Sequence, residues 1–299
     1  MTLPIDKTRP WRQENWDWRA ACNFILGGTG TGLLVAAALA LVPSGVFRAS
    51  AIVAMALVAA GLFSVWMEIG RPFRAANVVL HPRTSWMTRE SLIAPLVFLG
   101  AIAVLLDEAD SWRWPAAAAA LAFLYCQARM VGASKGIPAW RHRLVVPLLL
   151  VSGLAEGTGA LILVVLIGGG VSQWAGGALL VLVVARWLIW DRYRDALHRR
   201  GAPQKALSVL NEFAPHFGAL GAIIPAVFLL AAEVAGGVWF PALGAVFAIG
   251  GGWWLKLILM TRAGYNQGFA LPHLPARGSG SAGPAAKPGW SPAAGHNSP

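Results

Sequence analysis

Charged side chains are scarce in this chain. Only 12% of its 299 residues are Asp, Glu, Lys or Arg, whereas soluble domains carry about 25%. Hydrophobic residues make up 57% and gather in long blocks, which indicates a protein that crosses a membrane several times. The formal net charge of +11 does not indicate a nucleic-acid partner, because the basic residues lie between the blocks, where membrane topology places them.

Cysteine and histidine are scarce where metal sites would need them. The two cysteines, Cys22 and Cys126, cannot supply the four ligands of an iron–sulfur cluster or a structural zinc ion. A membrane haem needs histidines inside helices, and the six histidines fall between the apolar blocks, at a block end or in the tails. They are His81, His142, His198, His216, His273 and His296. We therefore expect neither haem nor iron–sulfur cluster in this chain, so that a partner must bring any metal centre.

The first twenty residues lack the apolar core of a cleavable signal peptide. They contain three acidic residues and the tryptophans Trp11, Trp16 and Trp18. Because tryptophan favours the boundary between membrane and water, we expect residues 1–20 to form a polar lead at the cytoplasmic interface.

Eight apolar blocks follow, each close to the roughly 20 residues that a helix needs to span a bilayer. They are residues 21–42, 50–68, 91–107, 115–132, 144–167, 174–190, 216–236 and 239–260. The sequence therefore predicts an all-α polytopic membrane protein with eight transmembrane helices over residues 21–260. Residues 261–299 should form a cytoplasmic tail, disordered from about 276, where Gly, Pro, Ala and Ser dominate.

The loops predict the orientation of the chain. The segments after the second, fourth and sixth blocks carry most of the basic side chains. These are Arg71, Arg74, Arg83, Arg89, Lys135, Arg141, Arg143, Arg192, Arg194, Arg199, Arg200 and Lys205. The opposite loops carry only Arg48 and Arg113. The positive-inside rule then places both termini and the basic loops in the cytoplasm of a bacterium, with the chain in its inner membrane.

Two short segments resemble each other. Gly27-Gly28-Thr29-Gly30 in the first helix matches Glu156-Gly157-Thr158-Gly159 in the fifth. Either the chain consists of two related four-helix halves, or the match arises by chance in a Gly- and Ala-rich membrane protein. The glycine run lacks the ending of a phosphate-binding loop, and small residues on a spanning helix favour close helix packing.

A polar hinge, residues 68–90, joins the second and third helices. Glu68 closes one helix and Glu90 opens the next, so that both carboxylates should lie at one membrane depth. Oxidation of a quinol removes two protons with two electrons, and a carboxylate or histidine near the ring oxygen is the group that moves them. The hinge therefore predicts a quinone site in which Glu68 and Glu90 handle protons. The alternative is a loop of basic anchors with carboxylates at helix ends.

Five further hinge residues are candidates for gripping the quinone or tuning the carboxylates. They are Arg71, His81, Ser85, Trp86 and Arg89.

Charged residues inside the predicted helices need a reason, since their burial in a membrane is costly. Glu156, near the middle of the fifth helix, is either a protonatable relay or a neutral acid hydrogen-bonded to a neighbouring helix. Arg129, Arg186 and Lys256 lie about one turn from the cytoplasmic ends, where long basic side chains usually extend to the interface. We therefore expect these three to reach the membrane surface.

Three segments resemble a known family. Trp16 to Gly32 reads W-x-W-R-A-A-x-N-F-x-x-G-G-x-G-x-G, Gly70 to Asn77 reads G-R-P-x-R-A-x-N, and His81 to Glu90 reads H-P-R-T-S-W-M-x-R-E. This pattern is similar to the NrfD/DmsC-type membrane anchors, the quinone-reactive subunits of complex iron–sulfur molybdoenzymes. The segment Gly264 to Pro272 resembles the branch of phenylacetyl-CoA:acceptor oxidoreductase anchors.

The resemblance implies eight helices in two four-helix bundles, no haem, and a site for menaquinone or ubiquinone near the cytoplasmic face. It implies a ferredoxin-like iron–sulfur subunit docked there and a molybdopterin catalytic subunit beyond it. Family anchors commonly carry a histidine before the Gly-x-Pro of the hinge, where this chain has Glu68, a departure that weakens the role assigned to that position. Asn23 and Tyr125 occupy places comparable to quinone-site residues of other members.

These observations favour a non-catalytic anchor subunit that exchanges electrons with quinone in the membrane. Two other functions stay open: a proton- or ion-translocating module with its site at Glu156, and a purely structural anchor.

Overall fold

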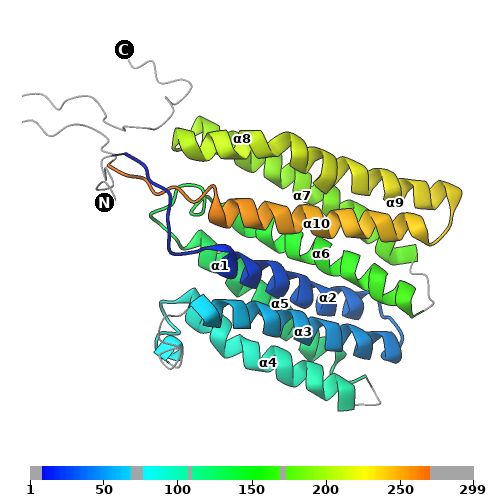
Figure 1. Ribbon diagram of the computed structural model, residues 1–299. Helices are drawn as coiled ribbons and strands as arrows, with labels where there is room; N and C mark the ends of the chain where they lie inside the picture. The colour runs from blue at the N-terminus through cyan, green and yellow to red at the C-terminus, as the bar shows by residue number, and fades with distance from the viewer. Residues whose placement is uncertain (1–8, 69–76, 107–109, 169–172, 270–299) are drawn as a thin grey trace, which may run out of the picture.

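The computed structural model describes residues 9–68, 77–106, 110–168 and 173–269, and these parts of the chain form eight helical rods that run side by side (Figure 1). Two rods contain a π-helical turn. The rods are α1–η1–α2 (Trp18–Cys22, Asn23–Gly27, Gly28–Leu39), α3 (Ser44–Glu68), α4 (Trp86–Leu106), α5 (Arg113–Gly132), α6 (Val145–Ile167), α7 (Gln173–Arg199), α8–η3–α9 (Gln204–Gly218, Ala219–Ile223, Ile224–Ala235) and α10 (Trp239–Thr261).

Seven of these rods, within the described ranges, have the length and apolarity to cross a membrane, so the chain is a multi-pass membrane protein. The remaining rod, α5, has 20 residues but carries Arg113, Gln127 and Arg129. It packs against α2, α4 and α6 and lies among the spanning rods. The eight helices predicted from the apolar blocks are therefore all present.

Several helices extend further than the apolar blocks indicated. Helix α3 begins at Ser44 rather than residue 50, and α4 begins at Trp86 rather than residue 91. The basic segment 191–212 is mostly helical: α7 continues to Arg199, and α8 starts at Gln204 after a turn at Gly201, where φ is +61°. Polar residues at the end of a spanning helix keep its backbone bonds while their side chains lie outside the apolar layer.

Glycines bring the first and fifth rods into close contact at the centre of the molecule. A Cβ atom on Gly32 would clash with the backbone of Gly153, and one on Gly157 would clash with Gly32 and Leu33. Helices α2 and α6 can approach this closely only because their contact surfaces lack side chains. The segments Gly27–Gly30 and Glu156–Gly159 therefore belong to two rods that pack against each other.

The order of rods supports two related halves. Helices α3 and α7 begin at Ser44 and Gln173, 129 residues apart, and α2 and α6 end at Leu39 and Ile167, 128 residues apart. Contacts link α2, α3, α4 and α5 in one half and α6, α7, α9 and α10 in the other. Because α2 also packs extensively on α6, the grouping into two four-helix bundles stays a prediction.

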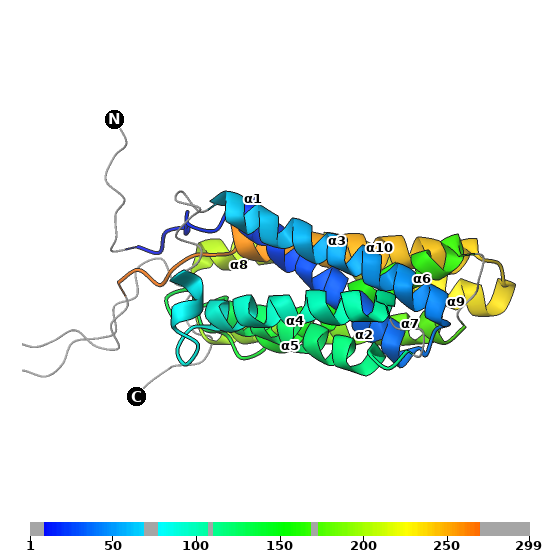
Figure 2. The same ribbon diagram turned by 90° about the horizontal axis from the view of Figure 1, so that it is seen from below.

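One end of the molecule carries the basic segments. The beginning and end of the described chain meet there, where the Gln13 amide donates to the Gly264 carbonyl at 2.8 Å. The loops after α3 and α5 and the turn after α7 lie at the same end (Figures 1 and 2). We call it the basic end. Its predicted cytoplasmic location stays a prediction, and the predicted disordered tail from residue 276 lies outside the described residues.

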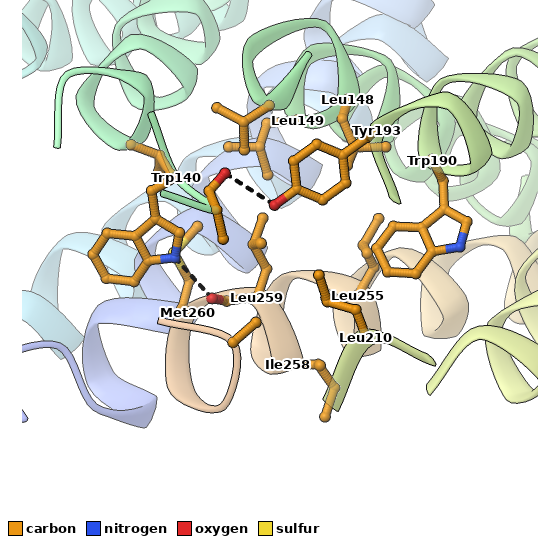
Figure 3. Close-up of a cluster of buried hydrophobic side chains, with 14 of the residues drawn as sticks. Trp140, Leu148, Leu149, Trp190, Tyr193, Leu210, Leu255, Ile258, Leu259 and Met260 are labelled. Carbon is orange, nitrogen blue, oxygen red and sulfur yellow. Dashed lines mark hydrogen bonds between the residues drawn. The ribbon is translucent and has the colours of Figure 1, made fainter. Parts of the chain in front are cut away.

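A buried aromatic and aliphatic cluster holds the basic end together (Figure 3). The indole of Trp140 donates to the carbonyl of Leu259 at 2.9 Å, and the hydroxyl of Tyr193 donates to the carbonyl of Ala139 at 2.9 Å. These bonds attach the loop between α5 and α6 to α10 and α7. Trp16 stacks on Trp140 with ring centroids 4.9 Å apart, which fixes the polar lead beside the same loop.

Candidate functional site

A π-helical turn interrupts the first rod at Asn23–Gly27. Such turns displace backbone carbonyls from the regular helical bonding pattern and are frequent at functional sites. Two carbonyls of this turn accept bonds from buried side chains of other rods. Gln127 Nε2 donates to the Asn23 carbonyl at 3.0 Å, and Lys256 Nζ donates to the Phe24 carbonyl at 2.9 Å. The π-turn thus places Asn23 and Phe24 between the two halves.

A cavity of about 230 Å³ opens beside this turn, near the basic end. Its walls are mostly apolar, with two carboxylates among them. The lining residues are Asn15, Trp16, Ala20, Asn23, Phe24, Val65, Glu68, Met87, Glu90 and Met130. Three residues that the sequence singled out, Asn23, Glu68 and Glu90, therefore share one cavity.

Glu90 is the buried carboxylate of the cavity, with a side chain that Asn23 holds in place. The fifth residue of α4, it is 4% exposed, and its Oε1 accepts a bond of 3.1 Å from Asn23 Nδ2. The predicted place of Glu90 at the start of its helix is wrong by one turn, because Ser85 caps α4: the Thr88 amide donates to Ser85 Oγ at 3.2 Å. Its extra turn carries Glu90 into the bundle, away from water.

Glu68 lies at the outer side of the cavity and is partly exposed. Beside it, Arg19 Nη1 donates to the Met67 carbonyl at 3.0 Å and pairs with Asp17 at 2.8 Å. The hydrogen bond from Arg19 holds the pKa of Asp17 below its ordinary value. One carboxylate of the cavity is thus buried and the other lies near charged groups at its edge.

Asn23 retains an unused acceptor. Its Oδ1 is buried and has no hydrogen-bond donor among the described residues. It lies beside Gly61 of α3, where a side chain would crowd it. A ligand hydroxyl in the cavity would meet a buried carboxylate and this amide side chain, which is a polar pair suited to a quinol head group.

Trp86, Arg89 and Tyr125 form a separate cluster with Arg129. The guanidinium carbons of Arg89 and Arg129 lie 4.1 and 4.8 Å from the centre of the Trp86 ring. Tyr125 meets the same ring edge-on at 5.7 Å, and its hydroxyl accepts from Arg129 at 3.3 Å. None of these four residues lines the cavity. Arg129 reaches the protein surface by stacking on an aromatic ring.

Two other candidates lie apart from the cavity. His81 is exposed at the start of the turn before α4, and only its backbone carbonyl accepts described bonds, from the amides of Thr84 and Ser85. Arg71 lies outside the described residues. The predicted roles of both at a quinone site stay predictions.

Three charged side chains meet in the interior behind the π-turn. Lys256 Nζ lies 2.7 Å from Glu156 Oε2, which also accepts a bond of 2.8 Å from Thr29 Oγ1. Arg186 donates to the carbonyls of Ala248 at 2.9 Å and Gly221 at 2.7 Å. We call Glu156, Arg186 and Lys256 the charged trio.

The charged trio corrects one prediction. Arg186 and Lys256 do not extend to the membrane surface: they are 0% and 1% exposed. Their hydrogen-bond partners explain the difference. Gly221 in η3 and Phe24 in η1 lie in π-turns that offer carbonyls to a side chain, and Glu156 supplies the countercharge. Sequence spacing gave no sign of either π-turn.

The sequence also missed Gln127 and the apolar walls of the cavity, Trp16, Phe24, Met87 and Met130. Gln127 lies one helical turn before Met130 on an apolar helix, and this buried amide was the one signal that pointed to it. Within the described ranges, no group of His, Cys, Asp and Glu side chains is arranged to hold a metal ion.

Comparison with known proteins gives a distant relative. The chain is 27% identical over 130 residues to a membrane-complex component named as part of the sulfite dehydrogenase of Allochromatium vinosum. The match covers 37% of this chain and 40% of the relative, so the chain spans less than half the length of the relative that it matches. No protein-family model matches the chain.

Proposed function

We propose that this protein is the membrane anchor and quinone-reactive subunit of a multi-subunit molybdopterin and iron–sulfur oxidoreductase in a bacterial inner membrane. The cavity that joins Glu90, Asn23 and Glu68 carries this proposal. It combines apolar walls for a ring with a buried carboxylate and an amide for the ring oxygens. Menaquinone or ubiquinone, when bound, would supply two-electron, two-proton chemistry.

The residues of the cavity divide the work. Glu90 lies within a polar, water-poor wall and takes or gives the proton at its carboxylate oxygen. Asn23 fixes the direction of that carboxylate through the 3.1 Å bond. Glu68 is partly exposed at the outer side, where it passes the proton between Glu90 and water at the basic end. Trp16 and Phe24, whose ring centroids are 5.5 Å apart, provide the flat apolar wall.

Electrons would reach this cavity from a partner, because the two cysteines of the chain cannot bind a cluster. The basic end offers the surface for an iron–sulfur subunit, which a molybdopterin subunit would supply with electrons or draw them from. The relative, a subunit of a sulfite dehydrogenase, supports assignment to a membrane redox complex. The phenylacetyl-CoA branch stays a prediction, and the relative makes sulfite a second candidate for the substrate of the catalytic partner.

Purification of the tagged full-length chain in mild detergent tests the assignment. An iron–sulfur subunit and a molybdopterin subunit should co-purify, and the preparation should contain iron and molybdenum and reduce or oxidise a quinone. Isolation of the chain with a substrate-binding partner and without redox metal would contradict it. A quinone-active complex whose rate is unchanged when Glu90 is replaced would instead favour the purely structural anchor.

A further inference from the structure

The charged trio lies behind the cavity wall, and Lys256 touches both. Its Nζ donates to Glu156 Oε2 at 2.7 Å and to the carbonyl of Phe24, a cavity-lining residue, at 2.9 Å. The carbonyl is that of the π-turn, one residue after Asn23. A change in the position of the π-turn would therefore alter the contacts of Lys256 directly.

The trio holds two cations and one carboxylate, all buried. The elements packed around it contribute Glu156 from α6, Arg186 from α7 and Lys256 from α10, and α2 contributes the neutral Thr29. Arg186 and Glu156 Oε1 both lie against Gly252, where a Cβ atom would clash with each of them. Glu156 thus faces both cations, and one positive charge has no countercharge among the described residues.

An uncompensated charge in the membrane interior is expensive. Arginine keeps its proton in proteins, whereas a buried lysine can lose its own. Loss of a proton from Lys256 leaves a neutral trio, in which the Glu156 carboxylate balances the Arg186 guanidinium. The trio therefore has two protonation states that differ by one proton, and the neutral one suits a dry surrounding.

We propose that the charged trio is an intramembrane proton-exchange site, which releases a proton from Lys256 when a quinone occupies the neighbouring cavity. This inference rests on the proposed function, because it assumes that quinone binds beside Phe24. A ligand against that wall displaces water from the vicinity of the excess positive charge and so favours the neutral trio. On release, the Lys256 ammonium becomes an amine, Glu156 stays a carboxylate, Arg186 stays a guanidinium, and the proton passes to the buffer.

Calorimetric titration of the full-length chain with decylubiquinone tests this coupling. The titration is carried out in detergent at one pH, in phosphate and in Tris, because the two buffers have different heats of ionisation. The difference in binding heat gives the number of protons exchanged per ligand. Wild-type protein should bind the quinone and release protons. Lys256→Met should bind it with release reduced about twofold or more, since the group that gives up the proton is gone.

Three variants keep the test decisive. Lys256→Arg retains the charge and a donor for Glu156 but cannot release its proton, so it should also reduce the release, even if Lys256→Met folds poorly. Lys205→Met, which removes an exposed lysine at the start of α8, should leave the release unchanged. Glu90→Gln should retain the part that depends on Lys256.

The outcomes separate the two proposals. Absence of quinone binding to wild-type protein would remove the proposed function and the inference with it. Binding without proton release, or release that persists in both Lys256 variants, would overturn the inference alone. Release that is lost only in Glu90→Gln would assign the proton to Glu90 and also overturn it.

Discussion

The side-chain amide of Asn23 donates to the carboxylate of Glu90 at 3.1 Å, across the first and third membrane rods. This bond joins a π-turn to the helix that follows the polar hinge, and both residues line the same cavity. Because Gln127 holds the backbone of Asn23 and Lys256 holds that of Phe24, the geometry at Glu90 depends on both halves of the chain.

Replacement of Asn23 by Ala should weaken the fold and the site together. The buried Glu90 carboxylate would lose its donor, and an unsatisfied buried acceptor costs about 1–3 kcal/mol. The thermal unfolding midpoint of the detergent-solubilised chain should fall, and its affinity for quinone should fall with it. Asn211→Ala, which removes an exposed contact with His198, is the matched control. An Asn23 variant as stable as this control would show that the bond contributes nothing.

Glu156→Gln should be more damaging than Lys256→Met. The first change leaves Lys256 and Arg186 buried without a carboxylate, and an uncompensated buried charge costs about 3–5 kcal/mol. The second leaves one guanidinium facing one carboxylate. Thermal unfolding of the two variants under identical conditions measures the order. Equal stability of the two would contradict the charge balance described for the trio.

The crossing of α2 and α6 should not tolerate a methyl group. Gly157→Ala places a Cβ atom against the backbone of Gly32 and Leu33, and overpacking of this kind costs about 1–3 kcal/mol or more. Gly250→Ala in α10 is the control, because a Cβ atom there meets nothing within 4 Å. It should stabilise the helix by about 0.5–1 kcal/mol. A chain that unfolds at the same temperature with either change would show that the helices do not cross this closely.

Stability should fall in mild acid because of His142, in the loop between α5 and α6. Burial lowers its pKa from 6.5 to about 4, with Arg200 and Arg143 adding repulsion. The unfolded chain then binds a proton at pH 5 that the folded chain does not, so this contribution is present above pH 6.5 and is lost as the pH falls toward 4. Between pH 7 and pH 5 the loss is about 2 kcal/mol.

Unfolding midpoints at pH 7 and pH 5 measure this loss. His142→Gln should be less sensitive to acid than the wild type, since glutamine does not titrate. His198→Gln, at an exposed histidine in α7, should behave like the wild type. Equal acid sensitivity of wild type and His142→Gln would exclude this explanation.

Apolar blocks were enough to place every rod, because each block has to satisfy its own backbone bonds within the membrane. The meeting of Glu68, Glu90 and Asn23 also followed from the sequence, since helices joined by a short hinge are neighbours. Helix ends were less predictable: polar side chains such as Ser85 cap a helix beyond the apolar block. Trp86, Arg89 and Tyr125 lie outside the cavity because their side of α4 and α5 faces away from it.

The charged trio could not be predicted from spacing. Arg186 and Lys256 lie where long basic side chains usually reach the interface. Their burial depends on Glu156 and on carbonyls that two π-turns expose, and these partners come from other rods. Contacts between distant segments decide such positions, and a single sequence records them only weakly.

Steady-state quinone turnover by the purified complex carrying Glu90→Gln tests the central claim most directly. Glutamine keeps an oxygen to accept the bond from Asn23 but cannot move a proton, so KM should change little. The account predicts that kcat falls about 10²–10⁴-fold, while the control Glu212→Gln, at an exposed position on α8, retains wild-type rates. Wild-type kcat and KM in Glu90→Gln would contradict the assignment of this cavity as the quinone site.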